Sequence, residues 1–157
     1  MPLEGFRRVP TVGVTWAFRY DTDEVWDYLV DRELLPEWLG RWISGSFTAG
    51  RELVVEHAPG YRCTSEVQVA EPGQRLSMSW WFPDEPRSHV DIRLRPVEVG
   101  EGSVLELTHS GLGEVADSYV PGWITHLTYF EASIRGAPIH SENFWALHGS
   151  FERLVRG

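Results

Sequence analysis

The amino-acid sequence predicts an α+β fold in which a curved antiparallel sheet is covered by one long helix. Two patterns carry this prediction. In several short stretches up to residue 109, apolar and polar side chains alternate, which is typical of strands with one buried face. From Trp123 onward, apolar side chains recur three and four residues apart, which indicates an amphipathic helix. A run of strands followed by helices favours an α+β arrangement.

The first part of the chain predicts one strand and two helices. Residues 11–18, TVGVTWAF, alternate and form the apolar row Val12, Val14, Trp16 and Phe18. Asp21 or Thr22 can cap a helix whose apolar residues are Val25, Trp26, Leu29 and Val30. Pro36 marks the start of a second, short helix.

Five further stretches alternate in the same way and are linked by turn sequences such as APG, EPGQ and VGEGS. Because links this short join antiparallel neighbours, we expect about six strands in series, including 11–18. The rows predicted to face the interior are Leu53, Val55 and His57; Cys63, Ser65, Val67 and Val69; Leu76, Met78, Trp80 and Phe82; Val90, Ile92 and Leu94; and Leu105, Leu107 and His109.

The C-terminal part predicts the covering helix and one more. The first carries the stripe Trp123, Leu127, Phe130 and Ile134, and Gly136 and Pro138 end it. A last helical segment has the stripe Phe144, Leu147, Phe151 and Leu154. We therefore expect a single domain over 1–157, with its core at about 11–136 and a helical extension at 137–157. The extension is predicted to cover a cavity mouth, contact a partner chain or add to the core.

Composition narrows the classes of function. The 157 residues carry a net charge of -9, and no cluster of basic residues appears, so neither nucleic acid nor an anionic membrane surface is an expected partner. Cys63 is the only cysteine, which excludes an internal disulfide. No apolar run is long enough for a membrane span or a signal peptide, and we expect a cytoplasmic location. Eight tryptophans suggest a wide core or an aromatic cavity.

Five motifs, in order along the chain, resemble the START-like (SRPBCC) superfamily, and within it the branch named after the activator of the heat-shock-protein-ninety ATPase. They are VWDYLVDRELLPEWLG, FTAGREL, VQVAEPGQRLSMSWWF, LELTHSGL and GWITHL. The resemblance spans about residues 11–136. It implies a helix-grip fold, in which about seven strands wrap a long helix around a cavity. It also implies binding of lipids, polyketides or other apolar molecules, or in some branches cyclase or dehydratase activity, and it carries over no catalytic residue.

The leading hypothesis is that the chain binds an apolar or amphipathic small molecule between the sheet and the long helix. Its predicted walls are Met78, Trp80, Phe82, Trp123, Leu127 and Phe130, and its predicted polar contacts are His57 and His109. For His109 a structural role is the favoured interpretation. In that role its ring bonds the backbone of the loop before the long helix, because buried polar side chains usually serve the protein's own hydrogen bonds.

Other hypotheses stay open. Trp81 faces outward and needs a cover, which favours a co-chaperone-like or oligomeric interaction module, including a homodimer. A cyclase or dehydratase needs an acid or base in the cavity, and the sequence offers only His57 and His109, without a carboxylate partner. His57, His109 and His126 match no metal-ligand spacing, so we expect no metal and no cofactor. Ser110 is no nucleophile beside His109, since adjacent strand residues face opposite ways.

Overall fold

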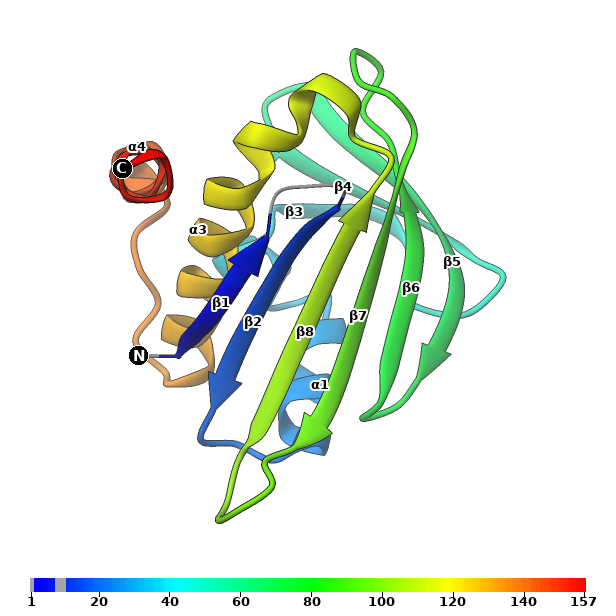
Figure 1. Cartoon of the computed structure of the whole chain (residues 1–157). Coiled ribbons are helices and arrows are strands. Elements are labelled where there is room, and N and C mark those ends of the chain that lie inside the picture. Colours follow the sequence, from blue (N-terminus) through cyan, green and yellow to red (C-terminus); the bar gives the residue numbers. More distant parts are fainter. Residues whose placement is uncertain (1, 8–10) are drawn as a thin grey trace.

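The strands form where the sequence alternates, because each can turn one row of side chains to the core and the other to solvent. The computed structural model describes residues 2–7 and 11–157. It joins eight antiparallel strands in the order β1-β2-β8-β7-β6-β5-β4-β3 (Figure 1). They are β1 (Leu3–Arg7), β2 (Val12–Phe18), β3 (Arg41–Gly45), β4 (Glu52–Ala58), β5 (Tyr61–Glu71), β6 (Arg75–Trp80), β7 (Ser88–Pro96) and β8 (Ser103–Ser110).

The helices are α1 (Thr22–Val30), α2 (Leu35–Trp38), α3 (Ala116–Ile134) and α4 (Phe144–Arg156), with short 3₁₀ turns at Gly113–Val115 and Ser141–Asn143. Asp21 caps α1: its side chain accepts from the backbone N–H of Glu24, and the Glu24 carboxylate accepts from the backbone N–H of Asp21. Within the described part of the chain, none of these helices is both long and apolar enough to cross a membrane.

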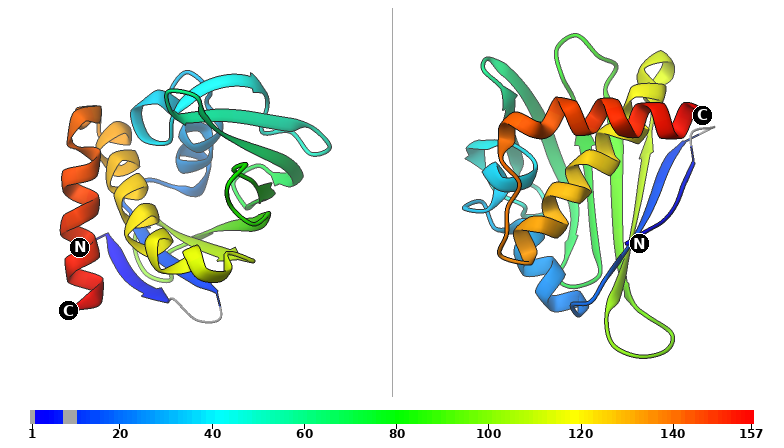
Figure 2. Two further views of the ribbon diagram at one scale, coloured as in Figure 1. Left: turned by 90° about the horizontal axis from the view of Figure 1, so that it is seen from above. Right: turned by 90° about the vertical axis from the view of Figure 1, so that its left-hand side faces the viewer.

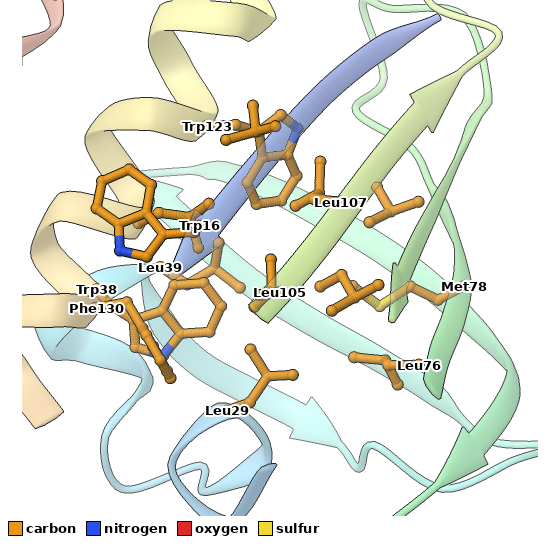
Figure 3. Packing of buried hydrophobic residues seen from close by; sticks show 14 of the residues in the cluster. Trp16, Leu29, Trp38, Leu39, Leu76, Met78, Leu105, Leu107, Trp123 and Phe130 are labelled. Atoms are coloured by element: carbon orange, nitrogen blue, oxygen red, sulfur yellow. The ribbon is translucent and has the colours of Figure 1, made fainter. Parts of the chain in front are cut away.

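The long helix α3 lies against the inner face of the curved sheet, which bends around it (Figure 2). Between them lies the core, where Leu105 and Leu107 of β8 meet Trp16 of β2 and residues of α3 (Figure 3). Phe130 packs edge-on against Phe18 and Trp38, with ring centroids 5.5 and 5.1 Å apart. The predicted α+β class, with a curved antiparallel sheet around a long helix, is confirmed.

The sheet has eight strands, where the alternation predicted about six and the family resemblance implied about seven. The unpredicted ones are the edge strands β1 and β3. Both are short, and β3 has a mixed pattern of half-buried and exposed residues, with a register shift between Trp42 and Ser44. A partly solvated edge strand with a register shift does not produce the alternation on which the prediction relied.

The C-terminal extension forms α4, which lies across the outer side of α3, away from the sheet (Figure 2). The predicted apolar stripe of this helix is correct for Phe144, Leu147 and Phe151, which pack against the core. It is wrong at its last position. Leu154 is 75% exposed, and Val155, one residue later, completes the packed row.

Candidate ligand-binding cavity

A cavity of about 380 Å³ lies between α2, α3 and α4 and the ends of strands β4, β5 and β6. On α3 it meets Gly122, where an added Cβ would find no atom within 4 Å, so this helix leaves space instead of filling it. Most of the wall is aromatic. Its rings come from Trp38, His57, Tyr61, Trp80, Phe82, Tyr119, Trp123, His126, Tyr129, Phe144, Trp145 and His148.

The predicted site residues divide between this wall and the core. His57, Trp80, Phe82 and Trp123 line the cavity. The other four do not line it: they are Met78, His109, Leu127 and Phe130, which are buried. Figure 3 labels Met78 and Phe130 among the packed apolar side chains. The structure thus brings four of the eight residues to one space, and ligand contact stays a prediction for each of them.

His109 is fully buried, and its ring is held by side chains, whereas the sequence predicted a bond to backbone. The indole N–H of Trp123 donates to Nδ1 of His109 over 2.9 Å. Burial lowers the pKa of His109 to about 3, so the ring is neutral and its proton sits on Nε2. That N–H donates to Ser88 Oγ over 2.7 Å, and the Ser88 hydroxyl donates to the Trp80 carbonyl. Every polar atom of the ring is therefore paired.

His57 and His126 face each other in the cavity wall, with ring centroids 5.7 Å apart. Desolvation lowers the pKa of His57 to about 3 and that of His126 to about 4, so both rings are neutral near pH 7. Nδ1 of His126 donates to the Trp38 carbonyl over 2.8 Å, because a carbonyl only accepts. Nε2 of His57 is buried and has no hydrogen-bond partner in the described residues.

Trp38 provides a second unpaired group. Its side chain is 5% exposed and lines the cavity, yet the indole Nε1 has no acceptor among the residues described. An indole N–H can only donate. Leaving it unpaired away from water costs about 1–3 kcal/mol.

Glu85, in the loop after β6, provides a carboxylate in the wall, which the sequence analysis did not expect. It accepts a short hydrogen bond from the Tyr119 hydroxyl, while the Tyr61 hydroxyl donates to Asp84 over 2.9 Å and lies 3.3 Å from Glu85 as a weaker, shared contact. Tyr119 in turn accepts from the indole N–H of Trp80 over 3.1 Å. Burial and Glu85 both raise the pKa of Tyr119, so this phenol keeps its proton. The cluster anchors the loop to α3 and places a carboxylate beside the aromatic rings.

Sequence reasoning missed Trp38, Glu37, Glu85 and Tyr119 as wall residues. Glu85 lies in FPDEP, a sequence typical of a turn. Tyr119 lies on α3 before Trp123, the first residue of the apolar stripe that predicted this helix. No local pattern joins these positions, because they come from a short helix, a loop and the start of a long helix. The proline in LPEW was the only nearby signal, and it marks a helix start.

The histidines of the cavity do not form a metal site of ordinary composition. Among the described residues, no three His, Cys, Asp or Glu side chains gather in a way that could hold an ion. The chemistry that the wall can supply is therefore aromatic contact, hydrogen bonding by neutral rings, and the charge of its carboxylates.

Comparison with known proteins agrees with this architecture. A model of the family described as Activator of Hsp90 ATPase homolog 1-like protein matches residues 19–134. No curated protein matches the chain in sequence. The matched range begins after β2 and ends at the last residue of α3, so it includes α2, β4, β6 and α3, which form most of the cavity.

Solved structures share the fold. CalU16 from Micromonospora echinospora is 23% identical, with a TM-score of 0.77 over 98% of this chain and 96% of that one. DynU16, from the dynemicin biosynthetic locus, is 24% identical, with a TM-score of 0.73 over 82% and 48%. The Aha1 dimer from Colwellia psychrerythraea is 15% identical, with a TM-score of 0.66 over 79% and 95%. At these identities the likeness establishes the fold.

Proposed function

The chain belongs to the Activator of Hsp90 ATPase homolog 1-like family, and from this premise we propose that it binds a small apolar or amphipathic molecule in the cavity. The observation that carries the proposal is a space of about 380 Å³ with a largely aromatic wall. Small-molecule sites have volumes of this order and the same combination of apolar rings with a few polar groups. Aromatic side chains also gain more than their buried area alone by stacking on a ligand ring.

The polar groups of the wall support a bound ligand over a merely unfilled core. Trp38 Nε1 and His57 Nε2 are buried and have no hydrogen-bond partner among the residues that the structure describes, and both residues line the cavity. Most buried polar atoms in folded proteins are paired, so two exceptions at one cavity point to a missing partner. A ligand that carries oxygen or nitrogen atoms can supply it.

The test is native mass spectrometry of the purified protein, with an organic extract of the denatured protein analysed beside it. We expect an added mass on the folded chain and the same compound in the extract. Gly122→Phe should abolish the added mass because its ring occupies the cavity, whereas the matched variant Gly122→Ala adds one methyl group in open space and should retain it. An empty wild-type chain that also fails to bind added apolar compounds would refute the proposal.

A second candidate, an interaction module, is favoured by one observation. Trp81 remains 42% exposed after the chain has folded, so the extension does not bury it as one prediction allowed. The Colwellia protein named above was solved as a dimer. The same native spectra test this candidate: a dimer peak that Trp81→Ser removes would support it, and a monomer at all concentrations would count against it.

The proposed setting is the cytoplasm. The single cysteine, Cys63, is a buried free thiol on β5, and burial raises its pKa to about 12. A protonated thiol without a disulfide partner suits a reducing compartment. Fractionation of the native cells, with detection of the protein by antibody, tests this location.

A further inference from the structure

The charges around the cavity carry a further inference about the ligand. Glu37 of α2 and Glu85 of the loop after β6 both line the cavity, and both are partly buried. In the described residues, neither has an arginine or histidine within 4.0 Å. Instead the Ser133 hydroxyl donates to Glu37 over 2.5 Å, and the Tyr119 hydroxyl donates to Glu85, with the Tyr61 hydroxyl shared between Asp84 at 2.9 Å and Glu85 at 3.3 Å.

The partly buried carboxylates elsewhere in the described chain do have arginine partners. Each of them, and the buried Glu131 as well, has an arginine at 2.7–3.1 Å; the partly buried acids are Glu56, Asp91, Glu106 and Glu152. Hydroxyl groups can satisfy the oxygen lone pairs of a carboxylate, but they supply no opposite charge. A counter-ion stabilises a partly desolvated charge. Among the described residues, Glu37 and Glu85 are the partly buried acids that have no such counter-ion.

Among the described residues, no arginine lines the cavity, and the sequence contains no lysine, so the basic side chains of the wall are the histidines His57, His126 and His148. Desolvation holds the pKa of His57 at about 3 and that of His126 at about 4, so these rings bring no positive charge near pH 7. An anionic ligand would meet two carboxylates without a compensating cation, which disfavours carboxylic acids and phosphate esters as occupants.

The ring faces around the cavity suit a cation. Four of the rings that line the cavity form two pairs: Trp80 and Trp123 are tilted by 56° to each other with centroids 5.1 Å apart, and Tyr61 and Phe82 stack at 4.3 Å, which covers one face of each and leaves the other for a ligand. The faces of such rings attract alkylammonium groups, and desolvation strengthens the attraction to about 2 kcal/mol. The indole N–H of Trp38, in a side chain 5% exposed, has no acceptor in the described residues, so it calls for an acceptor atom in the uncharged part of the ligand, away from the charged nitrogen.

We propose that the ligand is an amphipathic organic cation, an alkylated or aryl amine, whose charged nitrogen lies between the aromatic rings and the carboxylates of Glu85 and Glu37. This inference rests on the proposed function, because it assigns a charge to the molecule that the cavity binds. The ligand cation takes the place that arginine occupies at the other partly buried acids, and its apolar part fills the aromatic space.

The experiment uses two probes of almost equal shape, phenyltrimethylammonium and tert-butylbenzene, with 4-tert-butylbenzoate as an anion. Dissociation constants are measured at low ionic strength by quenching of tryptophan fluorescence and by calorimetry. The variants are Glu85→Gln and Glu37→Gln, which keep a hydrogen-bond acceptor and lose the charge. The control is Glu106→Gln, which changes net charge equally on the outer face, where Glu106 pairs with Arg95.

We expect Glu85→Gln to weaken binding of the cation about 10-fold and Glu37→Gln about 3-fold, with the neutral probe changed less than about 2-fold. The control Glu106→Gln should leave the dissociation constants of the cation and of the neutral probe unchanged. Of the three probes, 4-tert-butylbenzoate should bind the wild type most weakly. If the neutral probe binds and the cation does not, or if all three variants act alike, the assignment of charge is wrong while the cavity still binds ligands. If neither probe binds the wild type, both proposals fail.

Discussion

His109 and His57 both lie at the ends of inward-facing strand rows, but the protein completes the hydrogen bonds of only one. His109 receives a bond from Trp123 and gives one to Ser88, and its ring is fully buried. His57 is surrounded by the rings of Trp80, Phe82 and His126, and its Nε2 has no partner in the described residues. Both pKa values fall to about 3 because of desolvation.

The difference shows that burial and pKa alone do not separate a structural histidine from a candidate binding one. Both rings are neutral, and both lie beside tryptophans. What separates them is the supply of partners from the chain itself. A paired ring stabilises the fold, whereas a ring with an unpaired atom at a cavity costs free energy unless something else binds there.

The largest effect is expected for His109→Leu. The substitution removes the acceptor of the Trp123 indole N–H and the donor to Ser88, in a site with no access to water. Two buried polar groups lose partners, so the free energy of unfolding should fall by about 3–4 kcal/mol. Urea denaturation followed by tryptophan fluorescence measures it. A loss below about 1 kcal/mol would mean that the network contributes little to stability.

Two serines allow a matched test of the same network. Ser88 Oγ bonds Nε2 of His109 at 2.7 Å, and Ser77 Oγ bonds Nε2 of His89 at 2.8 Å. His89 is only half-buried, so water can replace its serine, whereas His109 has no such substitute. Ser88→Ala should therefore cost about 2 kcal/mol and Ser77→Ala about 0.5 kcal/mol. Equal losses in urea denaturation would contradict the assignment of His109 to a sealed network.

Acid should weaken the fold through these histidines. The unfolded chain binds their protons near pH 6.5, whereas the native pKa values are about 3 for His57 and His109 and about 4 for His126. Lowering the pH from 6.5 toward 4 therefore favours the unfolded state, and the stability present above pH 6.5 is progressively lost.

His57→Phe should make this loss less steep by up to about 1 kcal/mol per pH unit. Thermal denaturation of the wild type and the variant over this pH range measures the two slopes. Identical slopes would show that His57 takes up its proton as easily in the native state as in the unfolded one, which would contradict its burial in the wall.

The sequence predicted the fold better than the site for a physical reason. Alternation and helical spacing report which side of an element is buried, and they identified the inward rows of β4, β6 and β8 correctly. They carry no information on whether an inward-facing row of side chains borders packed core or an open cavity. Met78 and Trp80 share one row, yet the first lies in the core and the second lines the cavity. Glu85 and Trp38 enter the wall through a loop and a single helical turn, where no period exists.

The smallest effect, and the sharpest contrast with His109, is expected for His57→Phe at pH 8. The new ring has nearly the same shape and lies among the same aromatic neighbours, and it removes an Nε2 atom that has no partner in the described residues. The free energy of unfolding should stay the same or rise by about 1 kcal/mol, because no intramolecular hydrogen bond is lost and one unpaired buried polar atom is removed. A loss of about 3 kcal/mol in urea denaturation would mean that His57, like His109, makes interactions that stabilise the fold. The proposed difference between the two histidines would then be wrong.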